Sequence, residues 1–174
     1  MNLKDFKQEI DPNINEFIQN KITSISHDSD LLFLKDYFEY LKVFLKDGKR
    51  IRPYMAFLTY QAFDGENSKD IIKLLVFIEI FHTFCLVHDD IMDNSTKRHG
   101  IDTLHARIGK TNSNELGISH AILIGDYLFA WSWEIITNSS LDPALSKNLM
   151  KLFSEMIEEV FLGQEIDVQI TGEK

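Results

Sequence analysis

The stretch from Ile71 to Ile91 constrains the fold of this chain more than any other feature, because its composition predicts one long and almost wholly apolar helix. A helix that is apolar on every side must be surrounded by other elements, so this one is expected to be central and buried. Three carboxylates, Asp89, Asp90 and Asp93, stand at its end. The sequence therefore predicts a core helix whose acidic end opens into an interior cavity.

Helical periodicity continues through almost the whole chain, and no strand-like alternation is convincing. The central helix is expected to begin at Ser68, and further helices are expected over residues 3–25 (interrupted near Pro12), 30–46, about 53–63, 115–137 and 143–171. A turn is expected at 64–67, and the polar segment 94–114 is expected to be a loop with some helical turns. The chain is thus predicted to be all-α, a bundle of about six helices in one domain.

Composition and charge exclude several classes of protein. The chain has 18 basic and 27 acidic residues and a net charge of −9, which argues against a protein that coats nucleic acid. A small anionic ligand is not excluded, because local basic clusters can oppose the overall charge. The single cysteine, Cys85, fits a reducing compartment. With no signal-peptide core in the first residues and no apolar run expected to span a bilayer, we expect a soluble cytoplasmic protein.

Asp89 and Asp93 are one helical turn apart and share a face. They would repel each other unless water solvates them or they hold a metal ion, and the buried helix before them favours the metal. Oxygen ligands that leave room for water and phosphate oxygens suit Mg²⁺. A solvated acidic helix end is the alternative interpretation, and Asp90, which lies off the shared face, is the weakest candidate ligand.

Two basic groups suit an anionic ligand. Lys49 and Arg52 are three residues apart at the expected start of a helix, where free backbone amides also favour an anion. Arg98 and His99 follow the acidic cluster, so Arg98 is expected to face a diphosphate that the aspartates hold through Mg²⁺. For both groups the alternative is a basic loop exposed to water.

His82, Gln164 and Asp167 are further candidate site residues. His82 lies two turns before Asp89 on the same helix face and could donate to a phosphate oxygen, with a core histidine as the alternative. Gln164 and Asp167 are three residues apart on the last helix and follow apolar residues. These two polar residues either mark the end of the buried part of the last helix or complete the wall of the same cavity.

Four segments, GKRIRP, FHTFCLVHDDIMDNSTKRHG, IGDYLF and GQEIDV, occur in this order along the chain. Together they strongly resemble the trans-prenyl diphosphate synthases, from about Leu31 to the end. The resemblance implies an all-α bundle around a deep cavity, usually in a homodimer. It also implies an enzyme that joins an allylic diphosphate head-to-tail to isopentenyl diphosphate.

By this resemblance, Asp89 and Asp93 would coordinate Mg²⁺ ions on the allylic diphosphate, and Arg98 would bind the same group. Gln164 and Asp167 match positions near the allylic end of the cavity. The chemistry agrees with these residue types: departure of diphosphate creates an allylic cation, so the site must neutralise the leaving group and exclude water.

The resemblance also implies that Lys49, Arg52 and His82 hold isopentenyl diphosphate. The family usually has two arginines where this chain has Arg98 and His99. One contact to isopentenyl diphosphate is therefore expected to be weaker or dependent on pH.

Phe84, five residues before Asp89, falls where the family sets product length. A helical offset of five residues turns this side chain toward the tail pocket below the metal site. A bulky Phe84 with the smaller Cys85 beside it therefore implies a synthase of shorter chains, C15 or C20.

Two further departures from the family pattern carry expectations. Asp102 stands where a proline is common, which is expected to loosen the loop. The second aspartate-rich motif of the family is missing, together with the helices that carry it. Residues 1–174 are therefore expected to be the N-terminal portion of one prenyl synthase domain, with little or no activity alone.

Two rival classes share part of this pattern. A terpene cyclase fragment would also be all-α with an aspartate-rich motif, but GKRIRP argues against it because a cyclase has no second diphosphate to hold. A non-catalytic regulatory subunit would modulate a full-length synthase by dimerising with it. The intact pair Asp89 and Asp93 argues against a purely regulatory role, which does not need metal ligands.

Overall fold

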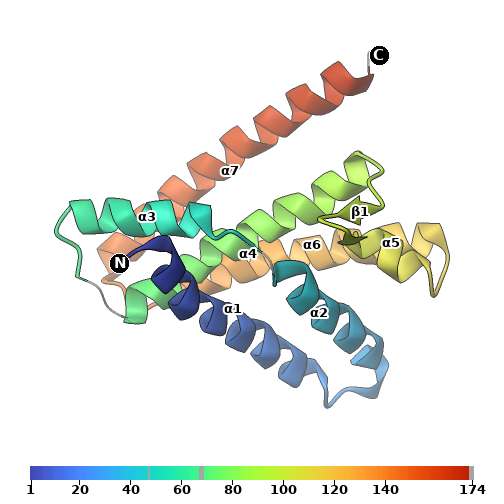
Figure 1. Cartoon of the computed structure of the whole chain (residues 1–174), viewed down its shortest axis with the longest axis horizontal. Helices are drawn as coiled ribbons and strands as arrows, with labels where there is room; N and C mark the ends of the chain where they lie inside the picture. Colours follow the sequence, from blue (N-terminus) through green and yellow to red (C-terminus); the bar gives the residue numbers. More distant parts are fainter. Residues whose placement is uncertain (47, 67–68, 173–174) are drawn as a thin grey trace.

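The computed structural model describes residues 1–46, 48–66 and 69–172, and it is built almost wholly of helices (Figure 1). In chain order the helices are α1 (Leu3–Ile25), α2 (Leu32–Leu45), α3 (Ile51–Ala62), α4 (Lys69–Met92), α5 (Leu104–Gly109), α6 (Asn114–Thr137) and α7 (Pro143–Gly172). A short 3-10 helix, Ser29–Leu31, precedes α2, and two strands, β1 (Lys97–Arg98) and β2 (Ile101–Asp102), lie between α4 and α5. The predicted all-α class is confirmed, with seven α-helices in the described residues instead of about six.

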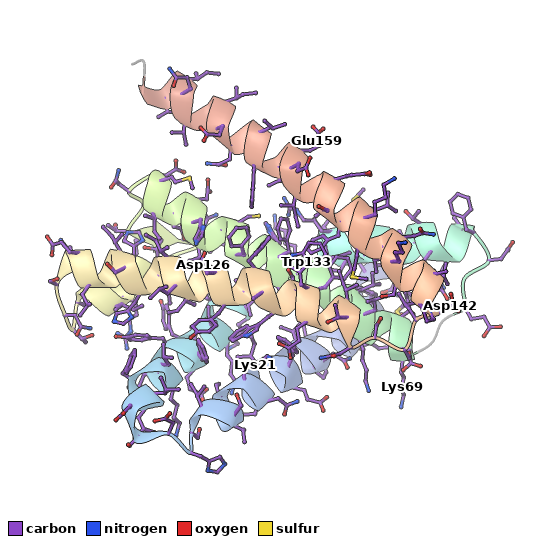
Figure 2. All side chains as sticks on the ribbon, turned by 180° about the vertical axis from the view of Figure 1, so that it is seen from behind. Lys21, Lys69, Asp126, Trp133, Asp142 and Glu159 are labelled. Carbon is purple, nitrogen blue, oxygen red and sulfur yellow. The ribbon has the colours of Figure 1, made fainter. Side chains whose placement is uncertain are left out.

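α4 is the central helix, as the sequence predicts. It packs against α1, α3 and α6, and Figure 2 shows α6 lying along it when the fold is seen from behind. Buried residues occur on all its sides, among them Ile72, Leu75, Ile80 and Val87. The predicted helix start at Ser68 and the last residue of the predicted turn, Asn67, lie outside the described residues.

α4 is also long and apolar enough to cross a membrane, with a hydropathy of 1.9, against the expectation that no run reaches this length. In this structure 61% of its apolar window is buried inside the fold. A helix surrounded by lipid would instead expose its apolar side chains. Its composition is therefore that of a core helix, covered by α1, α3 and α6.

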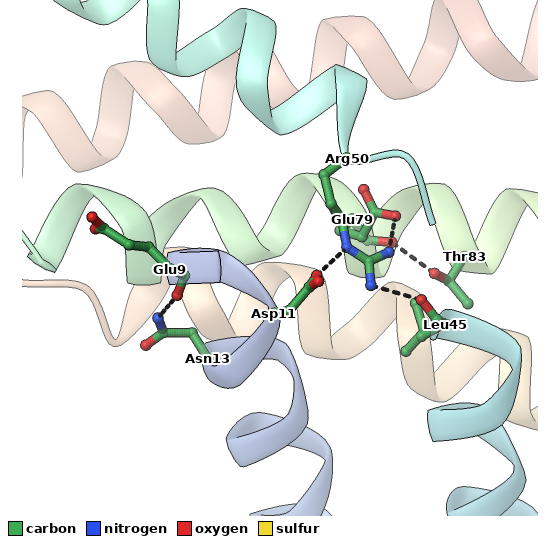
Figure 3. Close-up of polar contacts among 7 residues, drawn as sticks. All are labelled: Glu9, Asp11, Asn13, Leu45, Arg50, Glu79 and Thr83. Carbon is green, nitrogen blue, oxygen red and sulfur yellow. Dashed lines mark hydrogen bonds and ion pairs between the residues drawn. The ribbon is translucent and has the colours of Figure 1, made fainter. Parts of the chain in front are cut away.

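α1 runs unbroken through Pro12, so the predicted interruption there is wrong. Pro12 has no backbone N–H to donate to the carbonyl four residues before it. The Asn13 side-chain amide donates to the next carbonyl along the helix, that of Glu9, at 2.7 Å (Figure 3). Buried side chains lie on both sides of the proline, and before it Phe6 packs against Tyr54 and Phe57 of α3, so packing keeps the helix whole. The buried stripe consists of Phe6, Ile10, Ile14, Ile18 and Ile22.

The segment 94–114 is more ordered than the predicted loop. β1 and β2 form a two-stranded antiparallel sheet in which Arg98 pairs with Ile101. The turn between the strands has positive φ at His99 (50°) and Gly100 (84°), which is typical of the type I′ turn of tight hairpins. Strands of two residues are too short to show alternation, so the sequence pattern did not indicate them.

Asp102 at the end of this hairpin is firmly held. Its carboxylate pairs with Lys110 and, at 2.7 Å, with Lys97, and its carbonyl accepts a hydrogen bond from the Tyr40 hydroxyl at 2.8 Å. Hydrogen bonds from Lys110 and Lys97 lower the pKa of Asp102 to about 2. The expectation that Asp102 loosens this segment is therefore wrong, because the residue ties β2 to β1, α5 and α2.

α7 stands apart from the other helices. Figures 1 and 2 show its C-terminal half projecting away from the bundle. Among its described residues only Phe153 and Ile157 are buried, and Phe153 packs edge-on against Phe77 and Phe81 of α4. The apolar side chains that α7 leaves exposed are Leu145, Leu152, Met156, Val160, Phe161, Leu162, Ile166, Val168 and Ile170.

α4 and α6 come into close contact at Gly125. A Cβ atom at Gly125 would lie 2.1 Å from Nε2 of His88, so the imidazole occupies the space that any side chain would need. The same His88 nitrogen lies 3.1 Å from the Ile122 carbonyl oxygen, which fixes the ring against α6. Only glycine fits at position 125 without moving His88.

We expect Gly125→Ala to lower the free energy of unfolding by about 1–3 kcal/mol, because the new methyl group must displace the His88 ring or separate α4 from α6. Urea unfolding followed by circular dichroism measures the change. Gly163→Ala is the matched control, since nothing lies within 4 Å of a Cβ atom there. It should be neutral or slightly stabilising, because alanine is the better helix former. Equal losses in the two variants would contradict the packing argument.

Candidate functional site

The end of α4 carries three aspartates at different depths. The Asp89 side chain is 32% exposed, and Asp93, just beyond the helix end, is exposed. The Asp93 backbone N–H still donates to the Asp89 carbonyl at 2.9 Å, so the two carboxylates lie one helical turn apart. Asp90 instead faces inward and is only 1% exposed. The accessible acidic pair is therefore Asp89 and Asp93.

Arg98 of β1 binds both Asp89 and Asp90. Its Nε donates to Asp90 Oδ1 at 2.9 Å, and its Nη2 lies 2.7 Å from the same oxygen and 3.2 Å from Asp89 Oδ2. The hydrogen bond to Asp90 raises the pKa of Arg98, whereas burial raises the pKa of Asp90. Asp90 Oδ2 is buried without a hydrogen-bond partner in the described part of the chain. The hairpin thus places a permanent cation against the acidic helix end.

A pocket of about 510 Å³ opens between α4 and α7 beside Asp89; we call it the α4–α7 pocket. Gln164 Nε2 donates to Asp89 Oδ1 at 3.3 Å, so these two residues form its polar end. Asp167 is exposed and lies outside the pocket lining. A mostly apolar pocket with one polar end suits a ligand with an apolar tail and a charged head. The lining residues are Phe84, Cys85, His88, Asp89, Met92, Val160, Phe161, Gln164, Glu165 and Val168.

Asp89 and Asp93 fit one kind of metal site only. Within residues 1–46, 48–66 and 69–172, no three His, Cys, Asp or Glu side chains gather closely enough to hold a metal by themselves. Mg²⁺, however, usually keeps several waters and takes one or two carboxylates together with phosphate oxygens. The donor set therefore fits Mg²⁺ that is shared between the protein and a phosphate ligand.

A second pocket, of about 350 Å³, is rich in basic side chains; we call it the cationic pocket. Lys49 and Arg52 reach it from the start of α3, His82 from α4, and Arg98 and His99 from the hairpin. The first backbone amides of α3 lie at the same place and favour an anion. Five residues predicted from three separate segments thus line one pocket.

His82 is neutral in this pocket. Arg52 Nη1 lies 3.1 Å from His82 Nε2, and because a guanidinium can only donate, Nε2 accepts and the ring proton is on Nδ1. Burial, followed by the charges of Arg52 and Arg98, lowers the pKa of His82 to about 4. At neutral pH His82 therefore offers a ligand one N–H donor and no charge.

Arg98 connects the two pockets. It lines the cationic pocket and contacts Asp89, which lines the α4–α7 pocket. Lys49 and Arg52 therefore lie on the same side of the molecule as the acidic helix end. The arrangement can hold two anionic groups side by side, one of them through a metal.

The sequence did not single out three charged residues that form a cluster at the start of α3 (Figure 3), two of which, Arg50 and Glu79, line the cationic pocket. Arg50, only 3% exposed, forms ion pairs with Asp11 of α1 and Glu79 of α4, each at 2.7 Å. A signal for this pair exists in the sequence, because Glu79 is the only acid in the apolar stretch 71–88. A buried carboxylate requires a partner, and the basic segment 49–52 supplies it.

Comparison with known proteins agrees with this geometry. The Polyprenyl synthetase family model matches residues 34–174. The geranylgeranyl pyrophosphate synthase of Geoglobus acetivorans is 36% identical over 121 residues, which cover 70% of this chain and 35% of that protein. The geranylgeranyl diphosphate synthase of Methanosarcina mazei is 32% identical over 127 residues, which cover 73% of this chain and 36% of that protein.

A solved structure of the same class matches in fold. The geranylgeranyl pyrophosphate synthase of Corynebacterium glutamicum, complexed with isoprenyl diphosphate and magnesium, has a TM-score of 0.82 at 25% identity. The match covers 94% of this chain and 49% of that one. This chain therefore belongs to the polyprenyl synthetase family, and the resemblance to the trans-prenyl diphosphate synthases is confirmed. It spans between about a third and a half of the length of these relatives.

We expect the His82 imidazole to titrate near pH 4 in the folded chain, compared with 6.5 for an unperturbed histidine. Between these values the unfolded chain binds a proton at His82 and the folded chain does not. The contribution of His82 to stability is therefore complete above pH 6.5 and is lost as the pH falls toward 4. Histidine ring NMR, and urea unfolding of the wild type and His82→Gln from pH 7 to 4, measure both effects. A His82 titration near 6.5 would contradict the described burial.

Proposed function

We propose that this chain supplies the two diphosphate sites of a short-chain trans-prenyl diphosphate synthase. The observation that carries the proposal is the position of Arg98, which lines the cationic pocket and contacts the aspartate at the polar end of the α4–α7 pocket. Condensation of two diphosphates needs two neighbouring anion sites, because the reacting carbons must be held together in a defined orientation. One of these sites must also accommodate an apolar tail.

In the α4–α7 pocket, Asp89 and Asp93 would hold Mg²⁺ on the allylic diphosphate, and Arg98 would bind the same group. When bound, the metal supplies charge neutralisation for the leaving diphosphate as the allylic C–O bond breaks. Gln164 orients Asp89 through its hydrogen bond, and the apolar lining keeps water from the allylic cation. Asp167, exposed on α7, is proposed as a more distant part of the same wall.

In the cationic pocket, Lys49, Arg52 and His82 would hold isopentenyl diphosphate. Its alkene attacks the allylic cation, a carbon–carbon bond forms, and the proton that is lost goes to the departed diphosphate. Neutral His82 donates one hydrogen bond, while Lys49 and Arg52 supply the charge. His99, in place of a second arginine, adds a contact that depends on pH.

The proposed product is short, C15 or C20. Phe84 and Cys85 line the α4–α7 pocket, and Phe84 lies ~7.5 Å along α4 from Asp89 by the helical rise. The Phe84 ring packs against Phe129 and Phe161, with ring centroids 5.2 and 6.0 Å apart. Such an aromatic cluster limits the tail that fits below the metal. The relatives named geranylgeranyl diphosphate synthases support the same size class.

We further propose that residues 1–174 form the first half of the synthase domain and need an opposing set of metal ligands for turnover. The chain spans between about a third and a half of its relatives, and after Asp167 the sequence has one more acid, Glu173. The exposed apolar face of α7 also supports a partner on that side. The same face favours a second candidate, a subunit that modulates a longer synthase.

A homodimer in the cytoplasm is the proposed setting. α6 leaves the apolar side chains of Ile118, Ile122, Leu123 and Tyr127 exposed, and the last three lie on the half of the helix that faces away from its buried residues. Several exposed apolar side chains on one helix support an association surface. The single Cys85 supports a reducing compartment.

We expect inorganic pyrophosphate to bind this chain in a Mg²⁺-dependent manner, measured by isothermal titration calorimetry. The double variant Asp89→Asn, Asp93→Asn should weaken the Mg²⁺-dependent binding at least tenfold, about 1.4 kcal/mol, because asparagine keeps the shape but removes both charges. Asp70→Asn is the control, since Asp70 is exposed at the opposite end of α4. Equal binding by all variants, with or without Mg²⁺, would rule out the proposed metal site.

Product analysis separates the rival functions. With allylic and isopentenyl diphosphates and Mg²⁺, the 174-residue chain alone should give little product, and efficient turnover would show that no further half is needed. Hydrocarbon formed from the allylic diphosphate alone would identify a terpene cyclase. An altered rate of a longer synthase on mixing, without turnover by this chain, would identify a modulating subunit.

We expect the chain to sediment as a dimer and Leu123→Glu to shift it to the monomer, because a charge buried without a partner in an interface strongly disfavours association. Analytical ultracentrifugation measures the mass. Leu152→Glu on α7 is the matched control, with the two leucines 56% and 62% exposed. A monomer produced by Leu152→Glu instead would place the contact on α7.

A further inference from the structure

The connection between α2 and α3 contains a left-handed residue that is not glycine. Arg50, immediately before α3, has φ 55° and ψ 26°. For a residue with a Cβ atom this conformation costs about 1–2 kcal/mol, and it persists only where the surroundings enforce it. The backbone of Arg50 must therefore be held by contacts elsewhere.

The Arg50 side chain supplies those contacts (Figure 3). Its Nε donates to Asp11 Oδ1 and its Nη1 to Glu79 Oε1, each at 2.7 Å, and its Nη2 donates to the Leu45 carbonyl at 2.6 Å. The three acceptors belong to α1, α4 and α2. A planar guanidinium can donate hydrogen bonds in three directions at once, whereas a lysine ammonium on a flexible side chain cannot reach the same three acceptors in this geometry. Arg50 therefore fixes the start of α3 against three helices.

Gly48 makes room for this guanidinium. A Cβ atom at Gly48 would lie 1.8 Å from Arg50 Nη1 and 3.0 Å from Glu79 Oε1. Gly48 is not among the glycines with positive φ, so it is required for space and not for its own backbone conformation. The position of the Arg50 side chain and the absence of a side chain at Gly48 thus depend on each other.

Lys49 lies just before the left-handed residue and Arg52 two residues after it, and both line the cationic pocket. We propose that Arg50 is a positioning residue: its buried guanidinium holds the left-handed turn that directs Lys49 and Arg52 to the same anion. Arg50 also lines the cationic pocket, but it is only 3% exposed and each of its three nitrogens already donates to the protein, so its effect on a ligand passes through its two neighbours. The inference rests on the proposed function, because it requires that the cationic pocket binds a diphosphate.

The test compares variants that leave Lys49 and Arg52 in place. Arg50→Lys keeps the charge but loses the three-way contact, and Gly48→Ala keeps Arg50 but fills the space of its guanidinium. Pyrophosphate binding by calorimetry without Mg²⁺, which leaves the cationic pocket as the proposed site, should weaken at least tenfold in both under conditions where each variant is fully folded. The matched control is Lys21→Met, which breaks a half-buried ion pair between α1 and α6 outside the pocket lining. This control should lose stability but keep its affinity.

Two further readouts distinguish positioning from general stabilisation. In the ligand-free chain, Gly48→Ala retains every charge, yet the pKa of His82 should rise measurably above about 4 by NMR because Arg52 moves away from the imidazole, while burial of the ring still keeps it below 6.5. Arg50→Gly adopts positive φ without strain and should bind pyrophosphate several-fold more tightly than Arg50→Ala. Equal affinities of these two variants would overturn the role of the left-handed turn.

Arg52→Ala separates a failure of this inference from a failure of the proposed function. If the wild type does not bind pyrophosphate without Mg²⁺, or binds it equally well after Arg52→Ala, the cationic pocket is not a diphosphate site and both proposals fall. If binding requires Arg52 but survives Arg50→Lys and Gly48→Ala at full strength, only the positioning role of Arg50 is overturned.

Discussion

The burial of α4 is the constraint on which the rest of the structure depends. Along its buried length, this 24-residue helix can carry polar groups only where partners reach them. The sequence meets this condition with arginines that arrive from separate segments, two from the start of α3 and one from the hairpin. The resulting pairs are Glu79 with Arg50, His82 with Arg52, and Asp90 with Arg98.

These arginines also line the cationic pocket, although the chain as a whole has a net charge of −9. The three pairs differ in what they leave for a ligand. Glu79 neutralises the charge of Arg50, so Arg50 stabilises the start of α3 and adds no free charge to the cationic pocket. His82 is neutral, so the charge of Arg52 remains available in the cationic pocket. The same packing requirement therefore produces both the core and a locally positive surface.

The sequence predicted the all-α class and the central helix, because apolar periodicity is a local property. Charge spacing marked Lys49, Arg52 and Arg98 as candidates for an anionic ligand, whereas the grouping of Lys49 and Arg52 with His82 came from the family resemblance. The sequence did not predict the ion pair of Arg50 and Glu79, which depends on how α3 crosses α4. It also missed the hairpin, whose strands are too short for a pattern, and it wrongly interrupted α1 at Pro12. Asp167 was grouped with Gln164 by spacing, but only Gln164 reaches Asp89, and Val168 lines the pocket while Asp167, on another side of α7, does not.

The way in which α7 is attached has a mechanical consequence. The helix is anchored by Phe153 and Ile157, and Gln164 lies ~16 Å beyond Phe153 by the helical rise, on a segment whose outer side chains face solvent. A tilt of only ~10° about that anchor displaces Gln164 by ~3 Å. The width of the α4–α7 pocket thus depends on the tilt of α7 relative to α4 as much as on the volume of the lining side chains. A partner that packs against the exposed side of α7 would therefore determine the width of the α4–α7 pocket.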